Sequence, residues 1–137
     1  KQALKEAELI VIAPSNPLVS VLPILKTPGF HAALQETAVP ILAVSPLISG
    51  KALKGPADRM LASLYYRADA VGVANFYENI ANYYLMDAKD VKLSDEVSEL
   101  GMKPYTADIL MPDLASKVRV AQEILEIYQT VNQVESK

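Results

Sequence analysis

Two short apolar runs constrain the fold of this chain more than any other feature of its sequence. Residues 9–13 (LIVIA) and 39–44 (VPILAV) are rich in branched side chains, and each run stops at a polar turn that contains proline. Such runs are typical of strands buried on both faces of a parallel sheet. Residues 83–86 and 103–106 are weaker strand candidates. We predict that the first two runs are neighbouring parallel strands with buried side chains on both faces.

Helical segments are expected between and after these strands. Two of them follow a cap-like residue and a proline, Thr27-Pro28 before residues 29–37 and Gly55-Pro56 before residues 57–65. The other helices are expected over residues 69–82, over residues 89–100 with an end at Gly101, and after Asp113 as the cap of a long final helix. The alternation predicts an α/β fold, a Rossmann-like three-layer sandwich with a mainly parallel sheet and right-handed crossovers.

The two ends of the chain carry further information. In the final helix, apolar residues at three- and four-residue spacing predict one buried stripe, made of Leu114, Val118, Ala121, Leu125 and Tyr128. Residues 1–7 have no capping residue and no initiator methionine before them, so they are interpreted as the last two turns of a helix that begins earlier. We therefore expect residues 1–137 to be a portion of a longer domain.

Composition excludes several classes of function. The 137 residues suffice for one compact domain but not for two, and 16 acidic against 13 basic side chains give no broad positive field for a nucleic-acid partner. The absence of cysteine excludes disulfides and thiolate sites, and a single histidine, His31, argues against a histidine triad or metal site. No apolar run approaches the ~18 residues of a membrane span and no signal peptide is visible. We expect a cytoplasmic protein without membrane partners.

The loop after the first strand contains small polar residues. In an open α/β sheet, ligands bind beyond the carboxyl ends of the strands. Ser15, Asn16 and Ser20 lie in this loop beside a helix start, where backbone N–H groups favour an anion. The same residue types also build ordinary turns and caps, so both interpretations stay open.

The loop after the second strand is richer in charge. Lys51, Lys54, Gly55, Asp58 and Arg59 combine flexible cations with bare amides just before a helix, a combination that binds phosphate oxygens. Asp58 could balance the helix dipole, hold the neighbouring arginine, or bind a magnesium ion. Neither glycine-rich nucleotide fingerprint is present. A solvated charged loop is the alternative.

Several stretches resemble the 2-phospho-L-lactate transferase family of deazaflavin coenzyme F-420 biosynthesis. They are residues 13–25 (APSNPLVSVLPIL), 27–29 (TPG), 43–46 (AVSP), 50–51 (GK), 54–61 (KGPADRML), 74–77 (ANFY) and 106–111 (TADILM). The run KGPADRML is the most specific, and together the stretches cover nearly the whole chain. A related family of sugar-nucleotide-binding proteins shares the serine-rich first loop but usually lacks the lysine-led run. A nucleotide-sugar-binding regulatory protein without transferase activity is therefore the alternative.

The resemblance implies a Rossmann-like enzyme that moves a phospholactyl group from a guanosine diphosphate-linked donor to a deazaflavin acceptor, with release of GMP and help from Mg2+. Bacterial relatives use an enolpyruvyl group instead, and the donor group stays open. The family's amino-terminal half carries a glycine-rich nucleotide loop and an acidic residue that meets the acceptor, and neither occurs here. Residues 1–137 are therefore expected to be the carboxyl-terminal part of a single Rossmann-like transferase domain, inactive when isolated. The missing amino-terminal half is an expected partner, and a second copy of the chain is a candidate partner.

The residues that we expect at the site come from the two loops, and the chemistry that the resemblance implies fits them. No catalytic residue is assigned and the metal ligands are left unknown. The nucleotide- and phosphate-binding residues are expected to be Ser15, Asn16, Ser20, Lys51, Lys54, Gly55, Asp58 and Arg59. His31 is interpreted as a surface or partly packed residue, and Asp87 and Asp108 as caps or loop acids that could also reach a site. Core or subunit packing is favoured over ring stacking on the acceptor for the aromatic series Tyr65, Tyr66, Phe76, Tyr77, Tyr83 and Tyr84.

Overall fold

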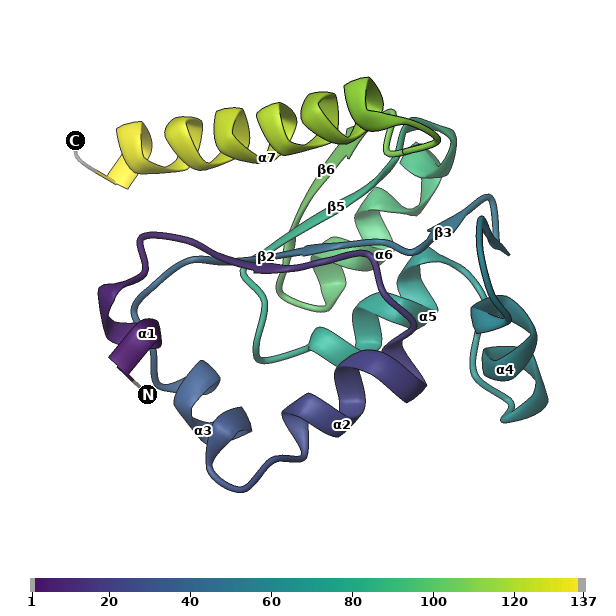
Figure 1. Cartoon of the computed structure of the whole chain (residues 1–137), viewed down its shortest axis with the longest axis horizontal. Coiled ribbons are helices and arrows are strands. Elements are labelled where there is room, and N and C mark those ends of the chain that lie inside the picture. The colour runs from purple at the N-terminus through teal and green to yellow at the C-terminus, as the bar shows by residue number, and fades with distance from the viewer. Residues whose placement is uncertain (1, 136–137) are drawn as a thin grey trace.

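The centre of the molecule is a four-stranded parallel sheet. The computed structural model describes residues 2–135, and its main sheet has the order β1-β2-β5-β6 (Figure 1). The strands are β1 (Ile10–Ile12), β2 (Ile41–Val44), β5 (Tyr83–Asp87) and β6 (Lys103–Ala107), and all three pairings are parallel. The prediction that the first two apolar runs are parallel neighbours is confirmed, as are both weaker strand candidates.

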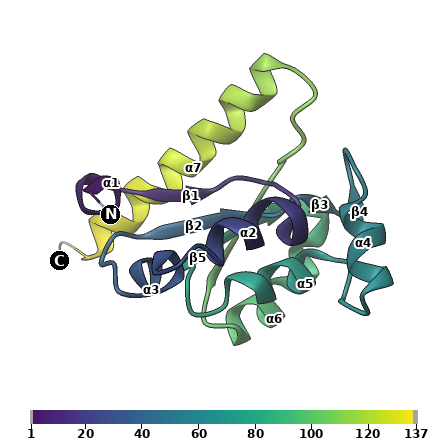
Figure 2. The same ribbon diagram turned by 60° about the horizontal axis from the view of Figure 1, so that its bottom comes forward.

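Helices cover the two faces of this sheet unequally. Figure 2 shows the long helix α7 (Leu114–Glu135) on one face, whereas α2, α3, α5 and α6 gather on the other. The shorter helices are α1 (Gln2–Glu6), η1 (Pro17–Val21), α2 (Leu22–Leu25), α3 (Phe30–Gln35), α4 (Ala57–Ser63), α5 (Ala70–Ala74), η2 (Asn75–Tyr77), η3 (Ala88–Leu93) and α6 (Ser94–Glu99). This mainly parallel sheet between two helical layers confirms the Rossmann-like α/β fold. None of the described helices is long and apolar enough to cross a membrane.

Strand β2 builds a core on each side of the sheet. Its residues are at most 1% exposed, and alternation sends Ile41 and Ala43 to one face and Leu42 and Val44 to the other. The first pair joins the larger core beneath the short helices, with Leu25, Leu34, Val73 and Val97 among its members. The second pair packs with Leu85 and Ile109 and with Ile127 and Val131 of α7.

Burial of the first strand on both faces was wrongly predicted. Ile10 and Ile12 pack against the larger core, but Val11 between them is 43% exposed on the α7 face. β1 is an edge strand of the described sheet, so it has a neighbouring strand on one side only. A run of apolar residues thus indicates a strand here, but it does not show which faces other elements cover.

The buried stripe of α7 was also wrongly predicted. Val120, Ile127 and Val131 are at most 8% exposed, whereas Leu114 is 75% and Leu125 54% exposed. Val118 and Ala121, from the same predicted stripe, are exposed as well, and Tyr128 is half-buried. With the half-buried Ile124 included, the buried set also recurs every three or four positions, so periodicity fits either set.

Helix starts agree only partly with the sequence. The cap at Asp113 is confirmed, because its Oδ1 accepts a hydrogen bond from the Ser116 backbone N–H (2.8 Å). Hydrogen bonds from the Ser116 side chain and backbone lower the pKa of Asp113. Thr27 is not a cap, however. Helix α3 begins after Gly29, which has φ of +74° and provides no side-chain bond.

The middle helices are shorter than expected. Residues 69–82 form α5 and η2 before a turn, and residues 89–100 divide into η3 and α6. The α6 region ends at Gly101 as predicted, where φ of +82° suits glycine. His31 lies exposed on α3, as expected.

Candidate functional site

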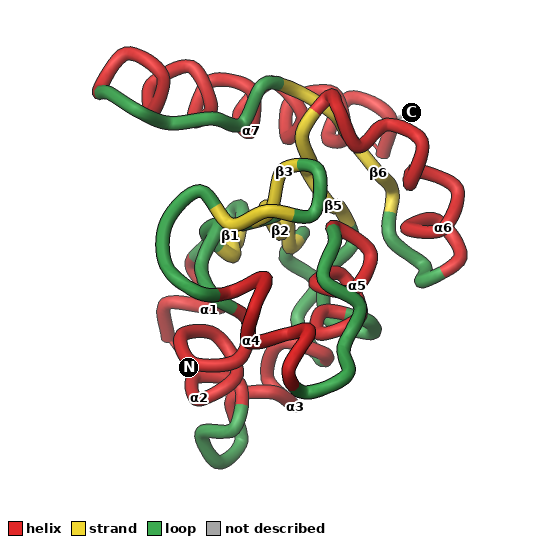
Figure 3. The backbone as a smooth tube through the Cα atoms, turned by 90° about the vertical axis from the view of Figure 1, so that its right-hand side faces the viewer, coloured by secondary structure: helices red, strands yellow, loops and turns green. Residues whose placement is uncertain are grey.

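The predicted site residues lie in the loops after β1 and β2. Because the strands are parallel, their carboxyl ends share one edge of the sheet, which Figure 3 views directly. The loop after β1 leads into η1, and the segment after β2 contains a small hairpin and then α4. The sheet topology therefore places both loops at the edge where open α/β sheets bind ligands.

The loop after β1 is organised by Asn16. Its side-chain Oδ1 accepts hydrogen bonds from the backbone N–H groups of Leu18 (3.0 Å) and Val19 (3.4 Å), so this residue caps η1. Within the described residues, the hydroxyls of Ser15 and Ser20 have no such partner. The capping interpretation is thus correct for Asn16, and the two serines keep free hydroxyls for a ligand.

The segment after β2 forms a tight hairpin that the sequence analysis missed. β3 (Leu47–Ile48) and β4 (Lys51–Ala52) pair antiparallel around Ser49 and Gly50, which both have positive φ. Positive φ at both positions is the geometry of a type I′ turn. A Cβ atom at Gly50 would also lie 3.1 Å from the Ala68 carbonyl oxygen. The Ser-Gly pair beside a short apolar run was the available signal.

Buried acceptors hold this hairpin in place. The Asp90 carboxylate, 7% exposed, accepts a hydrogen bond from the Ser49 backbone N–H (3.0 Å). The Ser45 hydroxyl donates to the Leu47 carbonyl (2.9 Å) and accepts from the Leu47 N–H (3.2 Å). Ser45 and Asp90 were not among the predicted site residues. They act through the backbone, by fixing the segment that carries Lys51.

Asp87 has a similar role at the end of the neighbouring strand β5. It is 4% exposed, and it accepts hydrogen bonds from the N–H groups of Lys89 (3.0 Å) and Ile109 (3.3 Å). The carboxylate thereby joins the loops that follow β5 and β6. Asp108 lies exposed and forms a salt bridge with Arg119 (3.0 Å). The cap and loop-acid interpretations of these two residues agree with these contacts.

Three cations near the hairpin are unpaired. Lys51, Lys54 and Arg59 are exposed, and across residues 2–135 none of them forms a salt bridge or a side-chain hydrogen bond. Asp58 is half-buried in the first turn of α4, a position that balances the helix dipole, and it forms no salt bridge to Arg59. Gly55 has φ of +75°, which turns the chain into α4.

Helix α4 brings the two loops together. It packs against both η1 and β4, and the Asn16 Nδ2 lies 3.5 Å from the Met60 sulfur. The first loop therefore lies beside the helix whose first turn contains Asp58 and Arg59. Among the described residues, no hydrogen bond joins Lys51 or Lys54 to the serines. That the eight predicted residues form one nucleotide- and phosphate-binding site remains a prediction.

The described residues contain no preformed metal site. No group of three His, Cys, Asp or Glu side chains within residues 2–135 could hold a metal ion.

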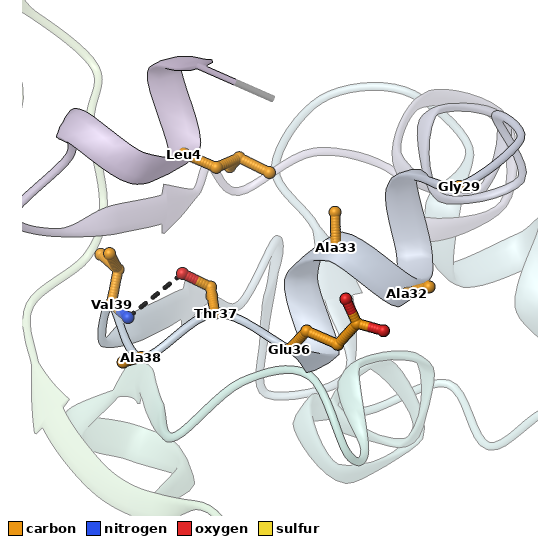
Figure 4. Close-up of a pocket in the computed structure, with 8 residues that line it drawn as sticks. All are labelled: Leu4, Gly29, Ala32, Ala33, Glu36, Thr37, Ala38 and Val39. Carbon is orange, nitrogen blue, oxygen red and sulfur yellow. Dashed lines mark hydrogen bonds between the residues drawn. The ribbon is translucent and has the colours of Figure 1, made fainter.

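A cavity of about 720 Å³ lies between α1 and α3 (Figure 4). It is lined by Leu4, Gly29, Ala32, Ala33, Glu36, Thr37, Ala38 and Val39, which precede β2. This cavity is at the opposite edge of the sheet from the predicted loops.

The aromatic residues separate into core and surface groups. Tyr77 and Tyr84 are fully buried, and the Tyr84 hydroxyl donates to the Ala70 carbonyl (2.9 Å). Burial raises the pKa of both phenols. Tyr65 is 99% exposed, and Tyr66, 48% exposed, packs its ring 5.1 Å from Phe76. Core packing is confirmed for Tyr77 and Tyr84.

Comparison with known proteins finds a matching family model and relatives that are named as transferases. The family model for 2-phospho-L-lactate transferase CofD matches residues 1–124. The phosphoenolpyruvate transferase of Streptomyces griseus is 31% identical over 95% of this chain and 41% of its own length. The 2-phospho-L-lactate transferase of Methanococcus vannielii is 31% identical over 94% of the chain and 40% of its own length. The chain thus spans about two fifths of these curated relatives. It belongs to the 2-phospho-L-lactate transferase family.

Proposed function

We propose that the gene product containing these 137 residues transfers a phospholactyl or enolpyruvyl phosphate group from a guanosine diphosphate-linked donor to a deazaflavin acceptor. The observation that carries the proposal is the set of three unpaired cations, Lys51, Lys54 and Arg59, around the hairpin and the start of α4. Two of them lie in the stretch KGPADRML of residues 54–61. The transferase names of the relatives favour this function over a regulatory sugar-nucleotide-binding protein.

The proposed reaction exchanges one phosphorus–oxygen bond for another. A hydroxyl of the acceptor attacks the phosphorus that bears the lactyl or enolpyruvyl group, and the anhydride bond to GMP breaks. GMP leaves with the bridging oxygen and its extra negative charge, and the hydroxyl proton passes to a base. Fixed positive charge lowers the barrier of such a transfer by stabilising the oxygens that gain charge. Lys51, Lys54 and Arg59 supply that charge, while Ser15 and Ser20 donate hydrogen bonds to the diphosphate.

Magnesium is proposed to accompany the donor. Mg2+ keeps several waters and is usually held by one or two carboxylates together with substrate phosphates. Asp58, half-buried in the first turn of α4 next to Arg59, is proposed as that carboxylate. When bound, the ion would neutralise diphosphate charge. The chain's own residues would still position the donor.

The base and the acceptor pocket are proposed to lie in a further part of the enzyme. The chain spans 41% and 40% of the two relatives above, and the carboxylates Asp87 and Asp90 are already bonded to backbone amides. We therefore predict that the purified 137-residue chain has no transferase activity. Measurable conversion of a deazaflavin acceptor by this chain alone would contradict that prediction.

The proposed function is tested with the gene product that contains these residues. It is incubated with a deazaflavin acceptor and with lactyl- or enolpyruvyl-diphosphoguanosine in turn, and GMP is measured by chromatography. We expect GMP and phosphorylated acceptor in equal amounts with at least one donor. A melting-temperature comparison with guanosine diphosphate and a uridine diphosphate sugar identifies the preferred base. Stabilisation by the uridine compound without GMP release would favour the regulatory protein.

A further inference from the structure

The segment that joins α4 to α5 touches the hairpin that carries Lys51. This segment, residues 64–69, is mostly exposed and has no regular secondary structure, and we name it the α4–α5 segment (Figure 1). Tyr65, near its start, is 99% exposed and has φ of +61°. A tyrosine is strained in this left-handed conformation, so the chain around it must be held by other contacts. Those contacts lead from α6 to the hairpin.

Arg67 fixes the α4–α5 segment to two helices. Its Nη1 and Nη2 donate to the two carboxylate oxygens of Glu96 on α6, and its Nε donates to Asp69. The other oxygen of Asp69 accepts a hydrogen bond from the Gly72 backbone N–H (2.9 Å) and caps α5. A two-point pair between a guanidinium and a carboxylate fixes orientation as well as distance. All three guanidinium nitrogens are therefore engaged within the chain.

Two successive carbonyl groups of the segment pack against glycines. A Cβ atom on Gly72 would lie 1.7 Å from the Arg67 carbonyl oxygen, and one on Gly50 would lie 3.1 Å from the Ala68 carbonyl oxygen. Gly72 belongs to α5, whereas Gly50 is at the turn of the hairpin. Glycine is the residue that permits such a close approach of two backbones. The segment therefore packs directly against both α5 and the hairpin turn.

The hairpin turn is thus held by contacts at two successive residues. Asp90 accepts the hydrogen bond from the Ser49 N–H (3.0 Å), and the carbonyl of Ala68 meets Gly50. Lys51 follows directly, and among the described residues its side chain forms no salt bridge or hydrogen bond. The position of Lys51 is therefore set through the backbone of the hairpin.

We propose that the α4–α5 segment positions Lys51 for the diphosphate of the donor, and that Arg67 is the positioning residue that fixes the segment. Each nitrogen of the Arg67 guanidinium already donates to Glu96 or Asp69, so Arg67 acts through the backbone and not by contact with the donor. The inference rests on the proposed function where it concerns the donor, but not where it concerns the position of the hairpin.

Hydrogen exchange in the complete gene product tests the position of the hairpin. Arg67→Gln removes the two-point pair, and Arg119→Gln is the matched control, because both arginines are 43% exposed but Arg119 bonds to the loop after β6. Exchange of the Ser49 amide relative to the amides of the inner strand β2 should become about 10-fold faster in Arg67→Gln, and change less than about twofold in the control. Glu96→Gln should reproduce the effect of Arg67→Gln. An unchanged ratio in both of these variants would overturn the proposal.

A double-substitution cycle tests the effect on binding. The affinity of the complete gene product for guanosine diphosphate is measured by titration calorimetry. Arg67→Gln should weaken it about fivefold, because a displaced hairpin no longer presents Lys51 to the phosphates. In the Lys51→Ala background the same change should weaken it less than about twofold, since residues that act through one contact are not additive. A merely structural role of Arg67 would lower the affinity equally in both backgrounds, and that result would overturn the proposal.

The two measurements separate this inference from the proposed function. If Lys51→Ala alone keeps normal affinity for guanosine diphosphate, the proposed role of Lys51 in donor binding is wrong, and the positioning of Lys51 for the donor falls with it. Unchanged exchange at Ser49 contradicts the role of the α4–α5 segment, whatever the outcome of a transferase assay.

Discussion

The acids and the cations near the carboxyl ends of the strands are used in opposite ways. Asp87 and Asp90 are at most 7% exposed and accept backbone N–H bonds from neighbouring loops. Lys51, Lys54 and Arg59 are exposed and, within the described residues, have no charged or hydrogen-bonding partner. The acids hold the loops in position, and the cations presented on those loops stay available for a ligand.

Other cations of this chain do have charged or hydrogen-bonding partners. Arg67 bonds to both Asp69 and Glu96, and the hydrogen bond to Glu96 is the largest cause that raises its pKa. Arg119 bonds to Asp108 and to the Leu110 carbonyl. These arginines connect elements of the fold. Substitutions should therefore separate residues that affect stability from residues that affect binding.

The largest expected effect is on stability, at Asp87. Replacing it with alanine leaves the N–H groups of Lys89 and Ile109 without their acceptor beside a buried strand end. We expect Asp87→Ala to lower the free energy of unfolding by about 3 kcal/mol, measured by urea denaturation. Asp87→Asn keeps an acceptor oxygen and should cost less. If the alanine variant loses less than about 0.5 kcal/mol of unfolding free energy, Asp87 does not hold the loops in position.

Substituting the lysines is expected to have a smaller effect, and one on donor binding rather than on stability. Lys51→Ala or Lys54→Ala in the complete gene product should weaken donor binding or turnover by about 1.5–3 kcal/mol, roughly tenfold or more, with little change in melting temperature. The loss should shrink as salt rises, because screening already weakens an exposed ionic contact in the parent protein. Titration calorimetry at low and high salt measures both effects.

The control for the lysines lies between them in the sequence. Leu53 is 50% exposed and carries no charge, so Leu53→Ala should leave the salt dependence of donor binding unchanged. Normal donor affinity and turnover of both lysine variants at low salt would mean that the segment is only a solvated turn.

The smallest effect concerns the paired cations and pH. The hydrogen bond from Arg67 lowers the pKa of Glu96 below its ordinary value of 4.5. Its contribution to stability is therefore complete above that value and is lost as the pH falls through the lower folded-state pKa. Between about pH 6 and about pH 3, the melting temperature of Glu96→Gln should fall less than that of the parent, by about 1–3 °C. Glu99→Gln, on the same helix α6, is the control and should follow the parent.

Local chemistry explains how much of the site was predictable. Strands, the Asp113 cap and the polar loops follow from short apolar runs and from side chains that bond to nearby amides. The hairpin at Ser49 and Gly50 was missed because two-residue strands carry almost no periodic signal. Asp90 was missed because its partner, the Ser49 amide, is 41 residues away in the sequence. Helical periodicity also does not show where α5 ends and the short helix η2 begins.

The sequence alone determined the parallel α/β arrangement and the family, since branched apolar runs and the stretch KGPADRML are local patterns. The tertiary structure alone decided which side of α7 is buried. Val120 and Leu125 both lie on apolar stripes of correct spacing, and only contact with the sheet selects the stripe of Val120. The same holds for Val11, whose side chain is as apolar as that of Leu42. Burial depends on which elements of the chain lie above a side chain, and that is a property of packing between distant segments.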